Sequence, residues 1–206
     1  MTPKIIFFDL ETTGLNWYHD SIIEICGYDF DISNNSIIHK FNNLCLDKSK
    51  STKVSERISK ITGITNDMLE NAASEEKVLK RFIYFITNTT KPIYLIAHNC
   101  KNFDKLFLLS RCKYYSIRIP NKIKFIDTVH LAKMLYPKKY SFSLKNLCID
   151  FNIQQTSAHR AEIDTIYLYY IFIKMYKDFI KINPDIDTSN YNLVLLSMLS
   201  KLNCNL

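Results

Sequence analysis

The chain has 206 residues, of which 47% are hydrophobic, and a formal net charge of +7 at pH 7. This length fits one domain with a small appendage, and the hydrophobic content excludes a disordered chain. This excess of basic over acidic residues favours a polyanionic partner. Its six cysteines form no C-x-x-C pair, so we expect reduced thiols rather than a zinc site. No stretch is apolar for long enough to cross a bilayer, so we expect an intracellular protein of the cytoplasm or nucleus with no membrane partner.

The first part of the chain is predicted to open with a three-stranded meander. Three apolar runs are separated by turn residues, and the first run is apolar on both faces, as in a central strand. These strands are expected at residues 4–10, 21–30 and 36–44. Two helices are predicted next, over 54–60 and 74–86, with Ser74 as the N-cap of the second.

The remainder alternates strands with helices. Short strands are expected at 93–97 and 124–126. Helices are expected at 102–115, 127–135, 144–151, 159–177 and 191–202. We expect Asp127 first to be the N-cap of the helix at 127–135. This order predicts an α/β fold with a mixed five-stranded sheet flanked by helices.

The chain is predicted to divide near its C-terminal end. An Asn-Pro-Asp break at 183–185 interrupts the helical pattern. We therefore expect one domain over residues 1–180 and a helical extension over residues 181–206. This extension either packs on the domain or docks a partner as an amphipathic helix.

Two acids lie at the end of the first predicted strand. Asp9 and Glu11 are two residues apart, so their side chains project from the same face of the strand. Two adjacent carboxylates at the end of a buried strand repel each other and are costly to desolvate. A hard divalent cation with oxygen ligands, Mg²⁺ or Mn²⁺, would compensate that cost.

Two later acids also sit on apolar faces. Asp104 is in the first turn of a predicted helix, with apolar residues three and four positions later. The alternative for Asp104 is an ordinary acid that complements a helix dipole. Asp164 heads a stripe of apolar residues on the long late helix, where a carboxylate needs a partner such as a metal.

A histidine precedes the last of these acids. His159 is five residues before Asp164, about 140° away around a continuous helix, so the two side chains would not share one face. We therefore expect His159 on the loop that enters the helix. An imidazole there titrates near neutral pH and can accept a proton from water, although a structural histidine is the alternative.

The order and spacing of these blocks resemble the DEDDh exonuclease family, the DnaQ-like group. The family's pattern is D-x-E at a strand end, N-x4-D at a strand-to-helix junction and H-x4-D at a late helix. Further similar segments lie at 9–15 (DLETTGL), 63–65 (GIT), 68–69 (ML), 127–128 (DT), 131–132 (LA), 143–144 (SL) and 147–148 (LC). The resemblance covers residues 4–177. Asp127 also resembles an acid found near the site in similar proteins, beside its expected role as an N-cap.

The resemblance implies a ribonuclease-H-like fold and hydrolysis of nucleic acid from its 3′ end to nucleoside 5′-monophosphates with two Mg²⁺ or Mn²⁺ ions. By motif, Asp9 would bridge both ions, and Glu11 and Asp164 would hold the ion that binds the attacking water. Asp104 would support the second ion beside the leaving oxygen. His159 would be the general base.

Contacts to the terminal nucleotide are expected from the segments around these acids. The expected contacts are Thr12, Thr13, Leu15, His98, Asn99 and Phe103. The backbone amides of Thr12 and Thr13 would meet the 3′ hydroxyl, and Leu15 would wedge against the terminal base. Phe103 has a core role as its alternative, and Asn99 either orients substrate or braces the strand end.

Basic and aromatic residues supply candidate contacts to the rest of the strand. The cationic candidates are Lys101, Lys105, Arg111, Lys113, Arg118, Lys122, Lys124, Lys138, Lys139 and Arg160. Tyr114, Tyr115 and Tyr136 lie among them, and aromatic faces can stack on unpaired bases.

These observations predict a metal-dependent 3′-to-5′ exonuclease that acts on single-stranded or frayed ends of DNA or RNA. The alternative is a proofreading or adaptor subunit that acts mainly by binding a polymerase complex, and a homodimer is also open. A catalytically inactive nucleic-acid binder is disfavoured because all five family positions are filled.

Overall fold

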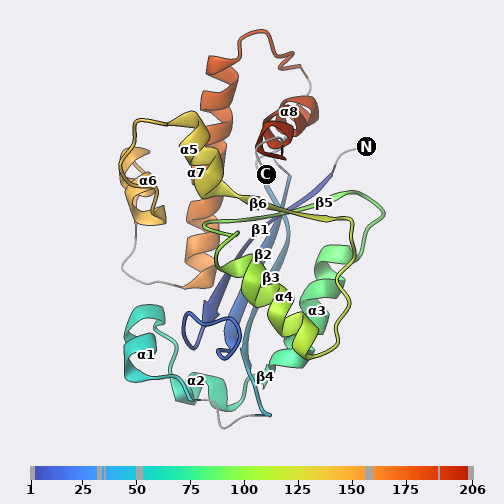
Figure 1. Ribbon diagram of the computed structural model, residues 1–206, viewed down its shortest axis with the longest axis vertical. Helices are drawn as coiled ribbons and strands as arrows, with labels where there is room; N and C mark the ends of the chain where they lie inside the picture. The colour runs from blue at the N-terminus through green and yellow to red at the C-terminus, as the bar shows by residue number, and fades with distance from the viewer. Residues whose placement is uncertain are drawn as a thin grey trace.

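A computed structural model describes residues 3–31, 34, 36–49, 53–155, 160–189 and 191–203 of the chain. A twisted sheet lies at the centre, with helices on both faces (Figure 1). The strands are β1 (Lys4–Thr12), β2 (Ile22–Asp31), β3 (Ser36–Leu46), β4 (Ala73–Ser74), β5 (Ile93–Ala97) and β6 (Ile123–Asp127). Their order across the sheet is β4-β3-β2-β1-β5-β6.

The sheet is mixed, as predicted. β1 is antiparallel to β2 and parallel to β5, which is in turn parallel to β6. The carboxyl ends of β1, β5 and β6 therefore meet at one edge of the sheet, where ligand sites of such sheets gather. The sheet has six strands rather than the predicted five, because the two-residue β4 pairs with the end of β3. A two-residue strand is too short to show a sequence period.

The helices cover both faces of the sheet. They are α1 (Glu56–Thr62), α2 (Asn66–Glu70), α3 (Glu75–Thr87), α4 (Asp104–Tyr114), α5 (Thr128–Leu135), α6 (Leu144–Asp150), α7 (Ala161–Ile182) and α8 (Tyr191–Asn203). The five-residue α2 was not predicted. Two predicted N-caps are confirmed: Ser74 accepts a hydrogen bond from the Lys77 amide, and Asp127 accepts one from Val129.

Alternating residues of β1 build two separate cores. Ile5 and Phe7 pack with α5, α6, α7 and α8 on one face. Ile6 and Phe8 pack with α3 and α4 on the other. This two-sided burial follows from the period of two along a strand and makes β1 the central element of the fold.

The C-terminal helix α8 contributes to the first core. Val194, Leu195, Met198 and Leu199 are buried in the same cluster as α7. The predicted boundary after residue 180 falls inside α7, which ends at Ile182. The division into a domain and an extension stays a prediction. Within the described residues, no helix combines the length and the apolar character needed to span a membrane.

A buried ion-pair network joins the sheet to α3 and α4. The Arg111 guanidinium, which is 2% exposed, donates to Asp47 Oδ2 at 2.6 Å and to Glu75 Oε1 at 2.7 Å. Glu75 Oε1 also accepts from the Ile22 amide at 2.9 Å, and its Oε2 accepts from the Tyr115 hydroxyl at 3.0 Å. The prediction that Arg111 contacts phosphate was therefore wrong, because this cation is sealed between two acids.

We expect Arg111→Met to destabilise the protein by about 3–5 kcal/mol, because Glu75 and Asp47 would stay buried without their cation. The free energy of unfolding from urea titration measures this. Lys113→Met, at an exposed position of the same helix, is the matched control and should change stability by less than about 0.5 kcal/mol. Equal stability of the two variants would contradict a structural role for the network.

Candidate active site

Three carboxylates from two elements meet beside the end of β1. Asp9 and Glu11 lie on the face of β1 that carries Phe7, and this face packs against α7. Asp164 is in the first turn of α7. A carboxylate oxygen of each of the three residues lies within 4.8 Å of the others. All three side chains are half-buried, so the oxygens form one enclosed cluster.

The fourth predicted acid is fully buried next to this cluster. Asp104 begins α4 and is 1% exposed. Among the described residues, its Oδ1 atom has no hydrogen-bond partner. A buried carboxylate oxygen without a partner is costly, and a cation that binds it would remove that cost.

Burial and mutual repulsion raise the pKa values of Asp9, Glu11 and Asp104. Burial raises the pKa of Asp9 well above its usual range, and the charges of Asp104, Glu11 and Asp164 raise it further. Burial, together with Asp164 and Glu24, raises the pKa of Glu11 to about 8. Burial also raises the pKa of Asp104 to about 8, although backbone amides oppose this shift.

The residues present fit a hard divalent metal. All the available donors are carboxylate oxygens, which suit Mg²⁺ or Mn²⁺ rather than zinc. The cluster combines converging oxygens, one orphaned acceptor and anions that repel each other. A bound divalent cation would attract the carboxylates that now repel each other, and it would give the unpartnered oxygen a ligand.

A buried ion pair anchors the start of α7. Glu24 lies directly opposite Glu11 in the sheet and is 1% exposed. Its carboxylate accepts from Arg160 Nη2 at 2.6 Å, from Arg160 Nε at 3.1 Å and from the Ala161 amide at 3.2 Å. The Asp164 amide in turn donates to the Arg160 carbonyl at 2.9 Å. This chain of contacts fixes Asp164 relative to β1.

Glu24 and Arg160 were not predicted as a pair. Arg160 was expected to contact phosphate, but its guanidinium is held by Glu24 in a fork geometry. A signal for Glu24 did exist in the sequence, because it is the one acid in the apolar run 22–26. A charged residue inside a buried strand needs a buried partner.

The loop after β1 is fixed by its own side chains. Asp20 accepts from the Thr13 hydroxyl at 3.1 Å and from the Asn16 amide at 2.8 Å. A Cβ atom at Gly14 would lie 2.4 Å from the Asp20 carboxylate, so any other residue there would displace Asp20 from these hydrogen bonds. Thr12 is buried, and its hydroxyl donates to the Gly14 carbonyl at 2.6 Å. Leu15 is 83% exposed at the tip of this loop.

The expected contacts after β5 are largely engaged within the fold. His98 bonds Thr128 Oγ1 at 2.9 Å through Nδ1 and the Phe142 carbonyl at 2.8 Å through Nε2, and burial lowers its pKa. Asn99 has φ 59°, and its side chain accepts from Asn102. Phe103 packs on Phe107 with ring centroids 4.9 Å apart. Substrate contacts by His98, Asn99 and Phe103 stay predictions.

The predicted general base, His159, lies outside the described residues. The described chain resumes at Arg160, directly before α7. The proposed role of His159 therefore stays a prediction from the motif.

Sequence comparison identifies relatives of the whole domain. A family model described as an exonuclease (RNase_T) matches residues 6–172. The DNA polymerase III PolC-type protein of Bacillus cereus is 33% identical over 176 residues, which are 85% of this chain and 12% of that protein. The DNA polymerase III subunit epsilon of Treponema pallidum is 36% identical over 173 residues, which are 82% of this chain and 74% of that protein.

Solved structures share the fold. The nuclease domain of 3′hExo, described as a DEDDh family member bound to rAMP, has a TM-score of 0.74 at 20% identity over 86% of this chain and 93% of that chain. Exonuclease X in complex with 5′ overhanging duplex DNA has a TM-score of 0.60 at 21% identity over 84% of this chain and 91% of that chain. These likenesses confirm the expected ribonuclease-H-like fold. The family match over residues 6–172 and the epsilon relative confirm the resemblance seen in the motifs: this chain belongs to the exonuclease (RNase_T) family.

Proposed function

We propose that this chain is a metal-dependent exonuclease that removes nucleoside 5′-monophosphates from the 3′ end of nucleic acid. The observation that carries the proposal is the meeting of Asp9, Glu11 and Asp164 oxygens within 4.8 Å, beside the unpartnered buried oxygen of Asp104. A cluster of this kind binds divalent ions, and family membership indicates phosphodiester hydrolysis as its use.

Each acid has a proposed role. Asp9 would hold both ions, Glu11 and Asp164 would complete the ligands of one, and Asp104 would support the other. Two bound ions would supply charge stabilisation for the entering and leaving oxygens of an in-line displacement. His159 would accept the proton of the attacking water, a role that contributes about 10²–10⁴-fold in rate.

The names of the relatives favour one kind of partner. PolC-type and epsilon proteins are named as parts of DNA polymerase III, so a proofreading subunit that binds a polymerase is the second candidate function. Four apolar side chains of α8, Val194, Leu195, Met198 and Leu199, are buried in the chain's own core and so are not available to dock a partner. The proposed substrate is a single-stranded or frayed 3′ end of DNA or RNA.

Asp9→Asn tests the activity. We expect the wild-type chain with Mg²⁺ or Mn²⁺ to shorten a 5′-labelled oligonucleotide stepwise from its 3′ end. The variant keeps the shape of the side chain but removes its charge, and should be at least about 100-fold slower, as for other preorganised electrostatic groups. Asp185→Asn is the matched control, since Asp185 is exposed beyond the far end of α7. Cleavage by the Asp9→Asn chain at the wild-type rate would contradict the proposal.

The raised pKa values predict a stability that depends on pH and metal. Glu11 and Asp104 titrate at about 8 in the fold and near 4 when unfolded, so their protonated forms stabilise the fold at low pH. Without divalent ions this contribution is lost as the pH rises through about 8. Mn²⁺ binds the ionised form, so it should raise the unfolding temperature more at pH 8.5 than at pH 5.5.

At 100 times its dissociation constant, Mn²⁺ would add about 2.7 kcal/mol, or roughly 5–10 °C for a domain of this size. Differential scanning fluorimetry measures the shift. Asp104→Asn should raise the unfolding temperature at pH 8.5 without metal and reduce the response to Mn²⁺. A Mn²⁺ shift that is equal at both pH values and in both chains would contradict the site.

A further inference from the structure

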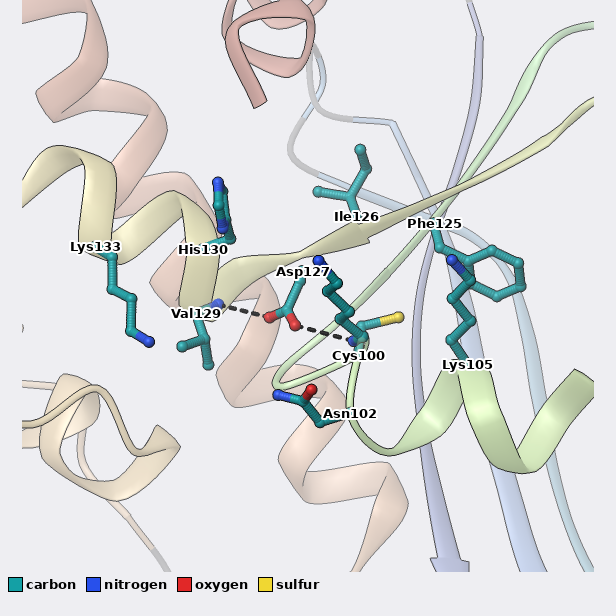
Figure 2. Close-up of a pocket in the computed structure, with 10 residues that line it drawn as sticks. Cys100, Asn102, Lys105, Phe125, Ile126, Asp127, Val129, His130 and Lys133 are labelled. Atoms are coloured by element: carbon teal, nitrogen blue, oxygen red, sulfur yellow. Dashed lines mark hydrogen bonds between the residues drawn. The ribbon is translucent and has the colours of Figure 1, made fainter. Parts of the chain in front are cut away.

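A cavity of about 230 Å³ lies beside the candidate active site, outside the four acids. It opens between α4 and α5 next to the edge strand β6 (Figure 2). Phe125, Ile126 and Val129 contribute apolar side chains to its lining, and Lys101, Lys105 and Lys133 bring three ammonium groups to it. This volume is below the roughly 300–1,000 Å³ of drug-sized ligand sites, so it suits one small unit with an apolar and an anionic part.

No acid of the fold pairs with the three lysines of the cavity in the described residues. Lys105 lies over the Phe125 ring at 5.6 Å, and Lys133 lies over the Phe142 ring at 5.9 Å. The acid in the cavity is already satisfied, because Asp127 accepts from the amides of Val129 and Lys101, each at 2.9 Å (Figure 2).

The cavity and the candidate active site share one connection. Residues 98–103 link β5 to α4, and Cys100, Lys101 and Asn102 of this link line the cavity. Asp104 follows the link directly. The Cα atoms of Lys101 and Asp104 are three residues apart and therefore at most roughly 11 Å apart. That span equals about three stacked nucleotides at 3.4 Å each. A strand that ends at the acids is therefore long enough to extend to the lysines of the cavity within two or three nucleotides.

We propose that this cavity binds an unpaired nucleotide two or three positions before the 3′ end of the substrate strand. The base lies against Phe125 and Val129, and its flanking phosphates lie against the three lysines. The inference rests on the proposed function for the position of the 3′ end. It adds a strand-binding site that requires the nucleotide to be unpaired, because a paired base could not turn into the cavity.

Fluorescence anisotropy of 5′-labelled single-stranded oligonucleotides tests the cavity in an Asp9→Asn background, where the strand is not cut. The test variant is Lys101→Gln/Lys105→Gln/Lys133→Gln. We expect it to bind an 8-mer at least tenfold more weakly, with a salt slope lower by about 2, because each lost contact removes about 0.7. A dinucleotide is too short to reach the cavity and should bind within twofold of its original affinity.

Two further variants separate the cavity from general charge. Lys77→Gln/Lys91→Gln/Lys177→Gln removes the same charge from exposed positions elsewhere and should leave 8-mer binding unchanged. Val129→Glu keeps every lysine but places an acid in the cavity, in the first turn of α5 where an acid favours the helix. It should weaken 8-mer binding as strongly as the triple variant.

Three results would overturn the inference. The cavity triple variant could bind the 8-mer as tightly as the original chain, it could lose equal affinity for the dinucleotide and the 8-mer, or the control triple variant could lose as much 8-mer affinity as the cavity variant. Tight binding of free nucleoside monophosphate that the triple variant abolishes would also overturn it, because the cavity would then hold a free nucleotide. None of these results requires catalysis. Failure of the proposed hydrolysis would instead show as uncut oligonucleotide in the wild-type chain.

Discussion

The mutual repulsion of four carboxylates at the end of β1 is the constraint on which this structure depends. Asp9, Glu11, Asp104 and Asp164 are drawn from three elements and share one poorly solvated volume. Burial and repulsion raise the pKa values of Asp9, Glu11 and Asp104, so the fold alone does not stabilise the charges of these three acids. Such a cluster persists only when the surrounding packing holds the acids in place and a ligand of opposite charge stabilises their negative charges.

The scaffold meets this constraint with rigid elements. β1 is buried on both faces, so Asp9 and Glu11 project from a strand that packs against helices on both sides. The ion pair of Glu24 with Arg160 secures the start of α7 and, through a backbone hydrogen bond, Asp164. The Arg111 network secures α4, which carries Asp104, to α3 and the adjoining strands. Two arginines, Arg111 and Arg160, thus serve the architecture rather than the acidic cluster.

The sequence predicted the local features of the site better than the long-range contacts that hold the site in place. The period of a strand placed Asp9 and Glu11 on one face, and the N-caps Ser74 and Asp127 were confirmed because capping is a local interaction. No local rule joins Asp104 and Asp164 to β1, and only the family's spacing suggested it. Arg111 was assigned to phosphate wrongly, because net charge does not reveal which cations are buried. Its partners, Asp47 and Glu75, are 64 and 36 residues away along the chain.

The central claim is that the four acids form a single centre for two divalent ions. The most direct measurement is anomalous diffraction from crystals of the wild-type chain soaked with Mn²⁺. The account predicts two anomalous peaks about 3.5–4 Å apart, bound by Asp9, Glu11, Asp104 and Asp164. Saturating Mn²⁺ that leaves the four carboxylates without any peak, or binds Asp9 and Glu11 while Asp104 has no ion, would contradict it.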